Sequence, residues 1–204
     1  MIATELGAAR TVRRGGATGL AVAVVAAAGC GALAARPALL AVSPQPVATL
    51  VVLYGALALV GVALPLSRAT TARAGSAACA GSSPALVATL TLGSLTFAAG
   101  RIVAGGHAPA HLTLAVVLAN SLAALAEELW FRRVCYALLA PAGTPVAVAG
   151  TAVLFAAVHV AAYGWWVVPL DLAAGLLLGW QRATSGSWVA PAVTHVVANV
   201  LVLL

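Results

Sequence analysis

Long apolar runs separated by short breaks dominate this chain, and they predict helices that cross a membrane. A spanning helix needs roughly 20 consecutive, mainly apolar residues, and most of the runs approach that length. The breaks carry prolines, glycines, serines and arginines, as at residues 37–46, 67–84 and 141–145. The predicted spans are residues 17–35, 47–66, 85–104, 111–139, 145–163, 166–180 and 187–204.

The composition supports a membrane protein. Hydrophobic residues make up 63% of the 204 residues and charged residues only 7%, whereas about a quarter of a soluble domain is charged. We therefore predict an all-α, polytopic transmembrane helix bundle of about seven spans, with six to eight as the range. It forms one integral-membrane domain, in which residues 1–110 contribute three spans and residues 111–204 a core of four.

The arginines indicate topology. The chain has a net charge of +6 and no lysine, but no basic cluster interleaved with aromatic residues, so nucleic acid is not a predicted partner. Cytoplasmic segments carry an excess of Lys and Arg. A cytoplasmic N-terminus satisfies this rule: it leaves Arg36 and Arg101 outside and places inside Arg10, Arg13, Arg14, Arg68, Arg73 and Arg182.

Two adjacent glutamates, Glu127 and Glu128, interrupt the fourth apolar run. A charge at the centre of a spanning helix costs roughly 2.5–3.5 kcal/mol even on lenient scales, which makes such acids candidates for function. No helix breaker occurs before Pro141, so the helix should continue to about Leu139. Glu127 then lies near the middle of the membrane.

Helix geometry places the two adjacent glutamates on different faces. Glu128 and Arg132 are four residues apart and share a face, in the favourable orientation for an ion pair. Glu127 is rotated by about 100° and has no partner on its own helix. We therefore expect Glu128 to be paired and Glu127 to be available for chemistry.

Two later spans carry further polar pairs at helical spacing, Phe155 with His159 and His195 with Asn199. Polar groups at this depth face the bundle interior or a water-filled cavity. The simplest arrangement brings together Glu127, His159, His195 and Asn199. Such a set can hydrolyse an amide: the glutamate takes a proton from a water held by one histidine, while the other histidine and the asparagine stabilise the oxyanion.

A metal mechanism is the alternative for the same residues. Two histidines and one glutamate form a known catalytic zinc set, so Glu127, His159 and His195 could hold zinc. The two histidines come from different helices, unlike the H-E-x-x-H arrangement on one helix. We prefer a site without a bound cofactor, and zinc remains the alternative.

These motifs resemble the three signature motifs of the CPBP family, the CAAX prenyl protease 2 and bacteriocin-processing (Abi) intramembrane proteases. The resemblance rests on Glu127-Glu128-x-x-x-Arg132, Phe155-x-x-x-His159 and His195-x-x-x-Asn199, in that order, and covers about residues 120–204. It implies that Glu127 and His159 activate a water, that His195 and Asn199 form the oxyanion site, and that the supporting residues are Glu128, Arg132 and Phe155.

We therefore predict a hydrolase, an intramembrane endopeptidase with a water-filled cavity that faces the cytoplasm. Its predicted partners are the lipid bilayer and a membrane-associated peptide or protein, prenylated or not. The predicted location is the bacterial cell membrane, and the oligomeric state is left open. The alternatives are a non-catalytic scaffold or bacteriocin-immunity protein, and a proton-coupled transporter, although the two halves lack the similarity that inverted repeats give a carrier.

Three other features concern packing. Asp171, Gly175 and Gly179 follow one another at intervals of four, which predicts a face of close helix contact with Asp171 in a structural role. Trp130 is too central for the interfacial belt and should pack in the core. Asn120 should join neighbouring helices.

Overall fold

The computed structural model of the chain describes residues 19–64, 66, 83–104 and 113–203. Within these residues nearly every position is helical and none lies in a strand, so the all-α prediction is confirmed. Five of the arginines used to predict topology, Arg10, Arg13, Arg14, Arg68 and Arg73, lie outside the described residues.

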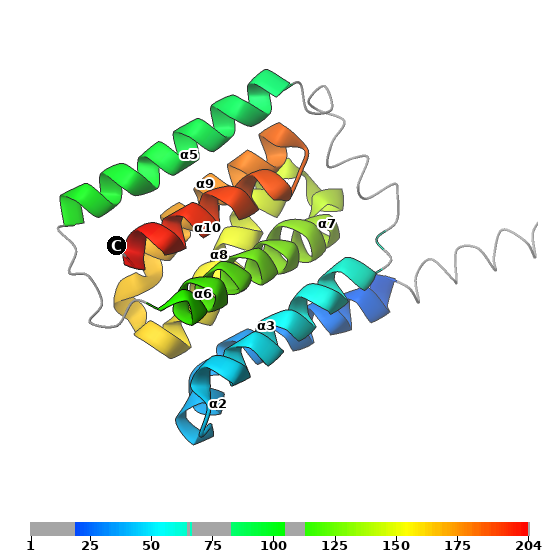
Figure 1. Cartoon of the computed structure of the whole chain (residues 1–204). Coiled ribbons are helices and arrows are strands. Elements are labelled where there is room, and N and C mark those ends of the chain that lie inside the picture. Colours follow the sequence, from blue (N-terminus) through cyan, green and yellow to red (C-terminus); the bar gives the residue numbers. More distant parts are fainter. Residues whose placement is uncertain (1–18, 65, 67–82, 105–112, 204) are drawn as a thin grey trace, which may run out of the picture.

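The chain runs back and forth along the long direction of the molecule in helical passes of alternating direction (Figure 1). The first pass is the helix Gly19–Ala34 followed by α2 (Arg36–Val42), with a bend of 49° between them. The second and third passes are α3 (Pro46–Ala63) and α5 (Ser83–Ala104). The fourth joins α6 (Leu114–Glu128), the π-helical segment η1 (Leu129–Cys135), α7 (Tyr136–Leu139) and the 3₁₀ turn η2 (Ala140–Ala142). The last three are α8 (Thr144–Tyr163), α9 (Val168–Ser185), which follows the 3₁₀ turn η3 (Trp165–Val167), and α10 (Val189–Leu203).

Several of these passes are long and apolar enough to cross a membrane. Four qualify as they stand: Pro46–Ala63, Pro84–Val103, Leu114–Ala142 and Thr144–Tyr163. The bent first pass makes up to five, and α10 is a shorter apolar helix. The chain is therefore a multi-pass membrane protein by length and composition. The count of seven spans and the side of the N-terminus remain predictions.

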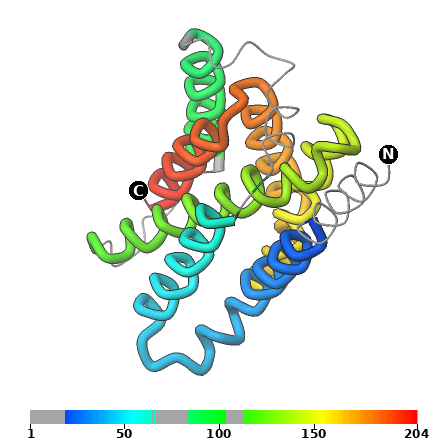
Figure 2. Tube along the Cα trace, turned by 90° about the vertical axis from the view of Figure 1, so that its right-hand side faces the viewer, coloured from blue at the N-terminus to red at the C-terminus, as the bar shows by residue number. Residues whose placement is uncertain are grey.

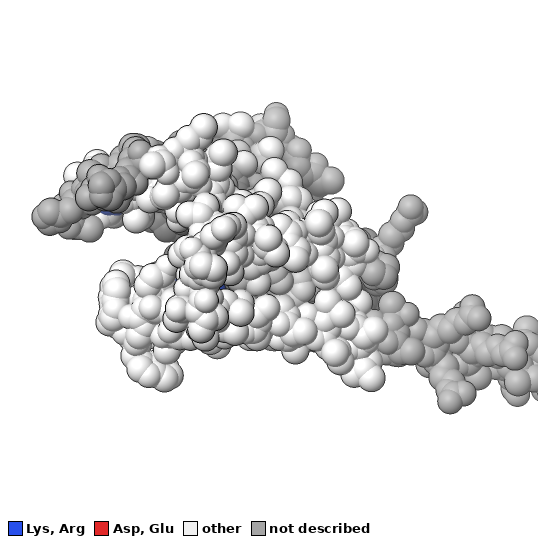
Figure 3. Space-filling view, turned by 60° about the horizontal axis from the view of Figure 1, so that its bottom comes forward, with Lys and Arg blue, Asp and Glu red and all other residues white. Residues whose placement is uncertain are grey.

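The fourth pass lies at the centre of the bundle. It contacts α3 on one side and α10 on the other, while α8 packs against α9. Helix α5 lies at the edge, against α10 and α9 (Figures 1 and 2). Almost no charge reaches the described surface in the view of Figure 3, and many large apolar side chains are exposed, such as Val52, Leu59 and Leu95. This surface suits a lipid environment.

The fourth pass continues beyond its two arginines, as predicted, and ends near Pro141. Its middle turns form a π-helix, a local widening that is often found at functional sites. Arg132 is fully buried within it. The neighbouring Arg133 donates to the carbonyl oxygens of Gly61 and Leu64 at the end of α3. The π-helix thus ties the fourth pass to the second.

Two close packing contacts confirm predictions made from the sequence. A Cβ added at Gly175 would lie 2.8 Å from the Cα of Ala152, so α9 rests directly on the backbone of α8. Trp130 is 1% exposed, its ring packs against Gly29, and its Nε1–H donates to the carbonyl oxygen of Ala26 at 3.2 Å. The first helix is thereby fixed against the fourth pass.

Candidate active site

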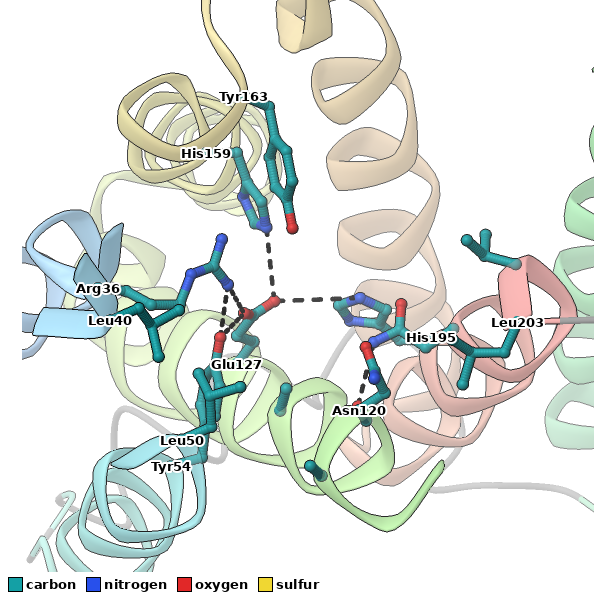
Figure 4. Close-up of a pocket in the computed structure, with 14 residues that line it drawn as sticks. Arg36, Leu40, Leu50, Tyr54, Asn120, Glu127, His159, Tyr163, His195 and Leu203 are labelled. Carbon is teal, nitrogen blue, oxygen red and sulfur yellow. Dashed lines mark hydrogen bonds and ion pairs between the residues drawn. The ribbon is translucent and has the colours of Figure 1, made fainter. Parts of the chain in front are cut away.

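A cavity of about 260 Å³ lies between the first, second, fourth, fifth and seventh passes. Glu127 lines it and lies about 20 Å along α6 from Leu114, at about 1.5 Å per residue. Figure 4 shows its carboxylate between side chains from several helices. The lining residues are Arg36, Leu40, Leu50, Tyr54, Ala119, Asn120, Ala123, Glu127, His159, Tyr163, His195, Asn199, Val202 and Leu203.

The four residues predicted to converge all line this cavity. Both imidazoles approach the same oxygen of Glu127: the Nε2 atoms of His159 and His195 lie 3.8 and 4.0 Å from its Oε2. Two polar atoms at such a separation can both reach one water oxygen, which needs about 2.8 Å to each. The geometry therefore suits a water shared by a carboxylate and two imidazoles.

Backbone and aromatic contacts hold His159. Its Nδ1–H donates to the carbonyl oxygen of Phe155 at 2.8 Å, which leaves Nε2 to face Glu127. The Phe155 ring lies 4.6 Å from the His159 ring and 5.6 Å from the His195 ring, between centroids. Tyr163 stacks on the other side of His159 at 5.9 Å. Phe155 therefore packs against both histidines.

His195 is held by the second glutamate. Its Nδ1–H donates to Oε1 of Glu128 at 2.9 Å, and the other oxygen of Glu128 lies 3.2 Å from Nε of Arg132. Glu128 and Arg132 are 0% exposed. The predicted Glu128–Arg132 pair is therefore present, and Glu128 has a further task that the sequence did not reveal. A carboxylate at Nδ1 favours an imidazolium, whose second N–H would face the cavity.

Asn199 lines the cavity, but its side chain already makes a hydrogen bond to another helix. Its Nδ2 donates to the carbonyl oxygen of Asn120 at 3.1 Å, so one of its two N–H groups joins α10 to α6. The side chain of Asn120 donates to Val116 on its own helix at 2.9 Å. Asn120 therefore joins helices, as predicted, through its backbone.

Sequence analysis missed two residues of the site. Arg36 was predicted only to lie on the external side, as a topology signal. It lines the cavity, with its Nη1 3.7 Å from Oε1 of Glu127. Tyr54 donates from its hydroxyl to the same Oε1 at 3.1 Å. The available signals were weak: an arginine directly before Pro37 at the end of an apolar run, and one tyrosine within a span.

Asp171 lies behind His159. Its Oδ2 is 3.9 Å from Nδ1 of His159, too far for a hydrogen bond. The same oxygen is buried without a hydrogen-bond partner among the described residues. Asp171 therefore adds charge near the histidine, while the carbonyl of Phe155 fixes its ring.

The metal alternative stays a prediction. Glu127, His159 and His195 supply the donor types of a catalytic zinc site. Among the described residues, no three His, Cys, Asp or Glu side chains are grouped closely enough to hold a metal ion as they stand. The contacts of Phe155 with His159 and of Glu128 with His195 engage Nδ1 in both rings, which leaves both Nε2 atoms free to face Glu127.

The cavity lies toward the end of the bundle where the first pass ends. Its outer lining includes Leu40 of α2 and Leu203 at the end of α10, and this end lies opposite the entry of the first helix at Gly19 (Figure 1). If the bent first pass is one crossing, a cytoplasmic N-terminus places the cavity on the other side of the membrane. The predictions of a cytoplasmic N-terminus and of a cavity that faces the cytoplasm then cannot both hold.

Comparison with known proteins finds one family model that matches part of the chain. Residues 109–201 match the model described as type II CAAX prenyl endopeptidase Rce1-like. The match runs from the fourth pass into α10, and so contains all three motifs of the resemblance described above. No curated protein and no solved structure matches the chain.

Proposed function

We propose, from the premise that residues 109–201 belong to the Rce1-like family of type II CAAX prenyl endopeptidases, that this protein cleaves a membrane-associated peptide with a water activated by Glu127. The family is one of hydrolases that act on peptide bonds. The observation that carries the mechanism is the approach of two imidazole Nε2 atoms to one oxygen of a buried carboxylate, at 3.8 and 4.0 Å.

The first step is the attack of water on the substrate. A water between Oε2 of Glu127 and Nε2 of His159 gives its proton to the carboxylate as its oxygen bonds to the scissile carbonyl carbon. The carbonyl oxygen becomes an oxyanion. The imidazolium of His195, supported by Glu128, donates a hydrogen bond to this oxyanion, as does the remaining N–H of Asn199.

The second step is the collapse of the tetrahedral intermediate. The C–N bond breaks, and the proton held by Glu127 moves to the leaving nitrogen. The products are a carboxylic acid and an amine, and Glu127 returns to its ionised form. One water is consumed and no redox change occurs.

The substrate class follows from the position of the site. The cavity lies among passes that qualify as membrane spans, and the surrounding surface is apolar. A substrate anchored in the bilayer reaches such a cavity more easily than a soluble peptide does. A prenylated peptide, the substrate that the family description indicates, is the first one to test. We place the enzyme in a bacterial cell membrane.

Cleavage by the purified protein tests the proposal. A farnesylated peptide that ends in a CAAX sequence and its unprenylated counterpart would be incubated with the enzyme, and the products identified by mass spectrometry. Glu127→Gln should reduce the rate at least about 100-fold, the lower range of general-base contributions. Glu5→Gln, which removes the same charge outside the described residues, is the matched control.

Each other result has a definite meaning. Full cleavage by Glu127→Gln would reject the general base. Stoichiometric zinc in the purified protein, with activity lost to a chelator, would replace the proposed mechanism with the metal one. No cleavage by the wild type, together with proton-coupled flux in proteoliposomes, would favour a carrier. A cellular phenotype that survives Glu127→Gln would favour a scaffold.

A further inference from the structure

The carboxylate of Glu127 uses its two oxygens differently. Oε2 faces His159 and His195, where the reaction is proposed to occur. Oε1 accepts a hydrogen bond from Tyr54 and lies 3.7 Å from Arg36. Residues of the first two passes therefore hold one oxygen, while the other faces the fifth and seventh passes.

Arg36 and Tyr54 form a connected unit. Nη1 of Arg36 donates to the hydroxyl of Tyr54 at 2.5 Å, and that hydroxyl donates in turn to Glu127 at 3.1 Å. Tyr54 is 1% exposed and the side chain of Arg36 is 12% exposed. The guanidinium also lies 5.6 Å from the ring centroid of Tyr163, and Figure 4 shows it beside the carboxylate of Glu127 and the hydroxyl of Tyr54.

The bend in the first pass places Arg36 there. The helix Gly19–Ala34 ends just before Arg36, and α2 begins at Arg36 with Pro37 in its first turn. Proline is favoured in the first turn of a helix, because the N–H that it lacks would have no hydrogen-bond partner within the helix there. The 49° change of direction lets a residue from the end of the first pass lie in the same cavity as Glu127.

A buried guanidinium is expensive unless it is paired, and Glu127 is the carboxylate that pairs with Arg36 among the described residues. The attraction between the guanidinium and the carboxylate holds Oε1 toward Arg36. The hydrogen bond from Tyr54 restricts the rotation of the same carboxylate. Both effects act on the proposed general base, and neither requires contact with substrate.

We propose that Arg36 and Tyr54 are positioning residues for Glu127: they anchor its Oε1 and direct its Oε2 to the water between the histidines. This inference rests on the proposed function. It also extends the active site beyond residues 109–201, since both residues precede the segment that matches the family. Two N-terminal passes then complete a site that the family motifs define only in part.

The charges around Glu127 determine how the test must be designed. Groups that face it or its partners come from every neighbouring helix: Arg36 of α2, Tyr54 of α3, His159 of α8, His195 of α10, Glu128 on its own helix, and Asp171 of α9 behind His159. Arg36 is the permanent cation closest to Oε1 in this set. Its removal should therefore lower kcat through the orientation of Glu127, whereas removal of an arginine that only stabilises the fold would leave the kcat of the folded protein unchanged.

Kinetics of peptide cleavage provide the first test. Arg36→Met should lower kcat by about 10- to 100-fold, the effect expected from a misplaced catalytic group, with KM changed by less than about twofold because substrate binding is retained. Arg36→Lys should restore part of kcat, because lysine keeps the charge and loses the planar fork. Tyr54→Phe should lower kcat with KM likewise retained.

The matched control is Arg101→Met, which removes an arginine that donates to the carbonyl oxygen of Leu201, away from Glu127. It should keep the kcat and the KM of the wild type. An Arg36→Met variant with an unchanged kcat would overturn the inference while leaving the proposed function intact. Normal cleavage by Glu127→Gln would instead overturn the proposed function.

A second test needs no substrate. The thermal unfolding of Arg36→Met, of Glu127→Gln and of the double variant would be measured in detergent and compared with that of the wild type. Because Arg36 contacts Glu127, the effects of the two substitutions should not be additive. Additive effects would overturn the inference even if no peptide substrate were found.

Discussion

Neighbouring carboxylates on one helix have different surroundings in this protein. Glu128 is 0% exposed and contacts Arg132 and His195, whereas Glu127 lines the cavity. The spacing of four residues was enough to predict the Glu128–Arg132 pair, because that contact is local to one helix. It could not predict Glu128 with His195, nor Glu127 with Arg36, since those contacts depend on how distant passes pack.

Loss of the Glu128 charge should destabilise the fold more than loss of the Glu127 charge. Glu128→Gln leaves Arg132 buried without its carboxylate, and breaking such a buried pair costs about 3–5 kcal/mol. Glu127→Gln keeps an acceptor for Tyr54 at the edge of a cavity. Unfolding of both variants in detergent, compared with the wild type, measures the difference. Equal stabilities would show that Glu128 is not needed to compensate Arg132.

Asp171 should contribute less to catalysis than a charge so close to His159 would suggest. The carbonyl of Phe155 holds the ring of His159 at 2.8 Å, whereas the carboxylate of Asp171 stands at 3.9 Å. Asp171→Asn should therefore reduce kcat by less than about 10-fold, below the usual range for a group that takes part in proton transfer. Steady-state kinetics would decide, and a loss above about 100-fold would make Asp171 part of the catalytic machinery.

At the level of elements, some contacts follow from sequence spacing and others do not. The glycines of α9 and the continuation of the fourth helix were predicted, because both depend on periodicity and on the absence of helix breakers. The π-helix of η1 and the bend before α2 were not. Each of these places an arginine: Arg132 beside Glu128, and Arg36 beside Glu127. A widened turn has no hydrophobic pattern of its own.

The contact between α8 and α9 should be intolerant of even one methyl group. A Cβ at Gly175 would lie 2.8 Å from the Cα of Ala152, whereas the surroundings of Gly55 in α3 are open within 4 Å. Gly175→Ala should destabilise the protein by about 1–3 kcal/mol through overpacking. Gly55→Ala should be neutral or stabilising by less than about 1 kcal/mol. Thermal unfolding of the two variants provides the comparison, and equal midpoints would contradict close packing at Gly175.

At the scale of the whole molecule, the passes that follow the two arginine-rich segments begin at the end opposite the cavity. The N-terminal segment carries Arg10, Arg13 and Arg14, and the connection between α3 and α5 carries Arg68 and Arg73. Both precede passes that start at the end away from the cavity (Figure 1). The positive-inside rule then predicts that the cavity opens on the non-cytoplasmic side. The sequence alone left this conflict hidden, because the position of the cavity depends on where Arg36, His195 and Glu127 meet.

Labelling from outside the cell tests this orientation. Single cysteines at Gln45, on the cavity side, and at Ala142, at the opposite end, would be introduced after replacement of Cys30, Cys79 and Cys135; both positions are exposed. A membrane-impermeant maleimide should modify Gln45→Cys in intact cells and Ala142→Cys only after lysis. The reverse pattern would place the cavity on the cytoplasmic side and the N-terminus outside.

The depth of Glu127 also sets a condition on the length of the substrate. The carboxylate lies about 20 Å along α6 from its first residue, and an extended chain covers about 3.3 Å per residue. A peptide that enters from the cavity end must therefore supply about six residues in extended form before its scissile bond reaches the site. Folded domains and intact transmembrane helices cannot provide such a stretch without unwinding. Protein tails that lack regular structure next to a lipid anchor meet the condition without any further energy to unfold them.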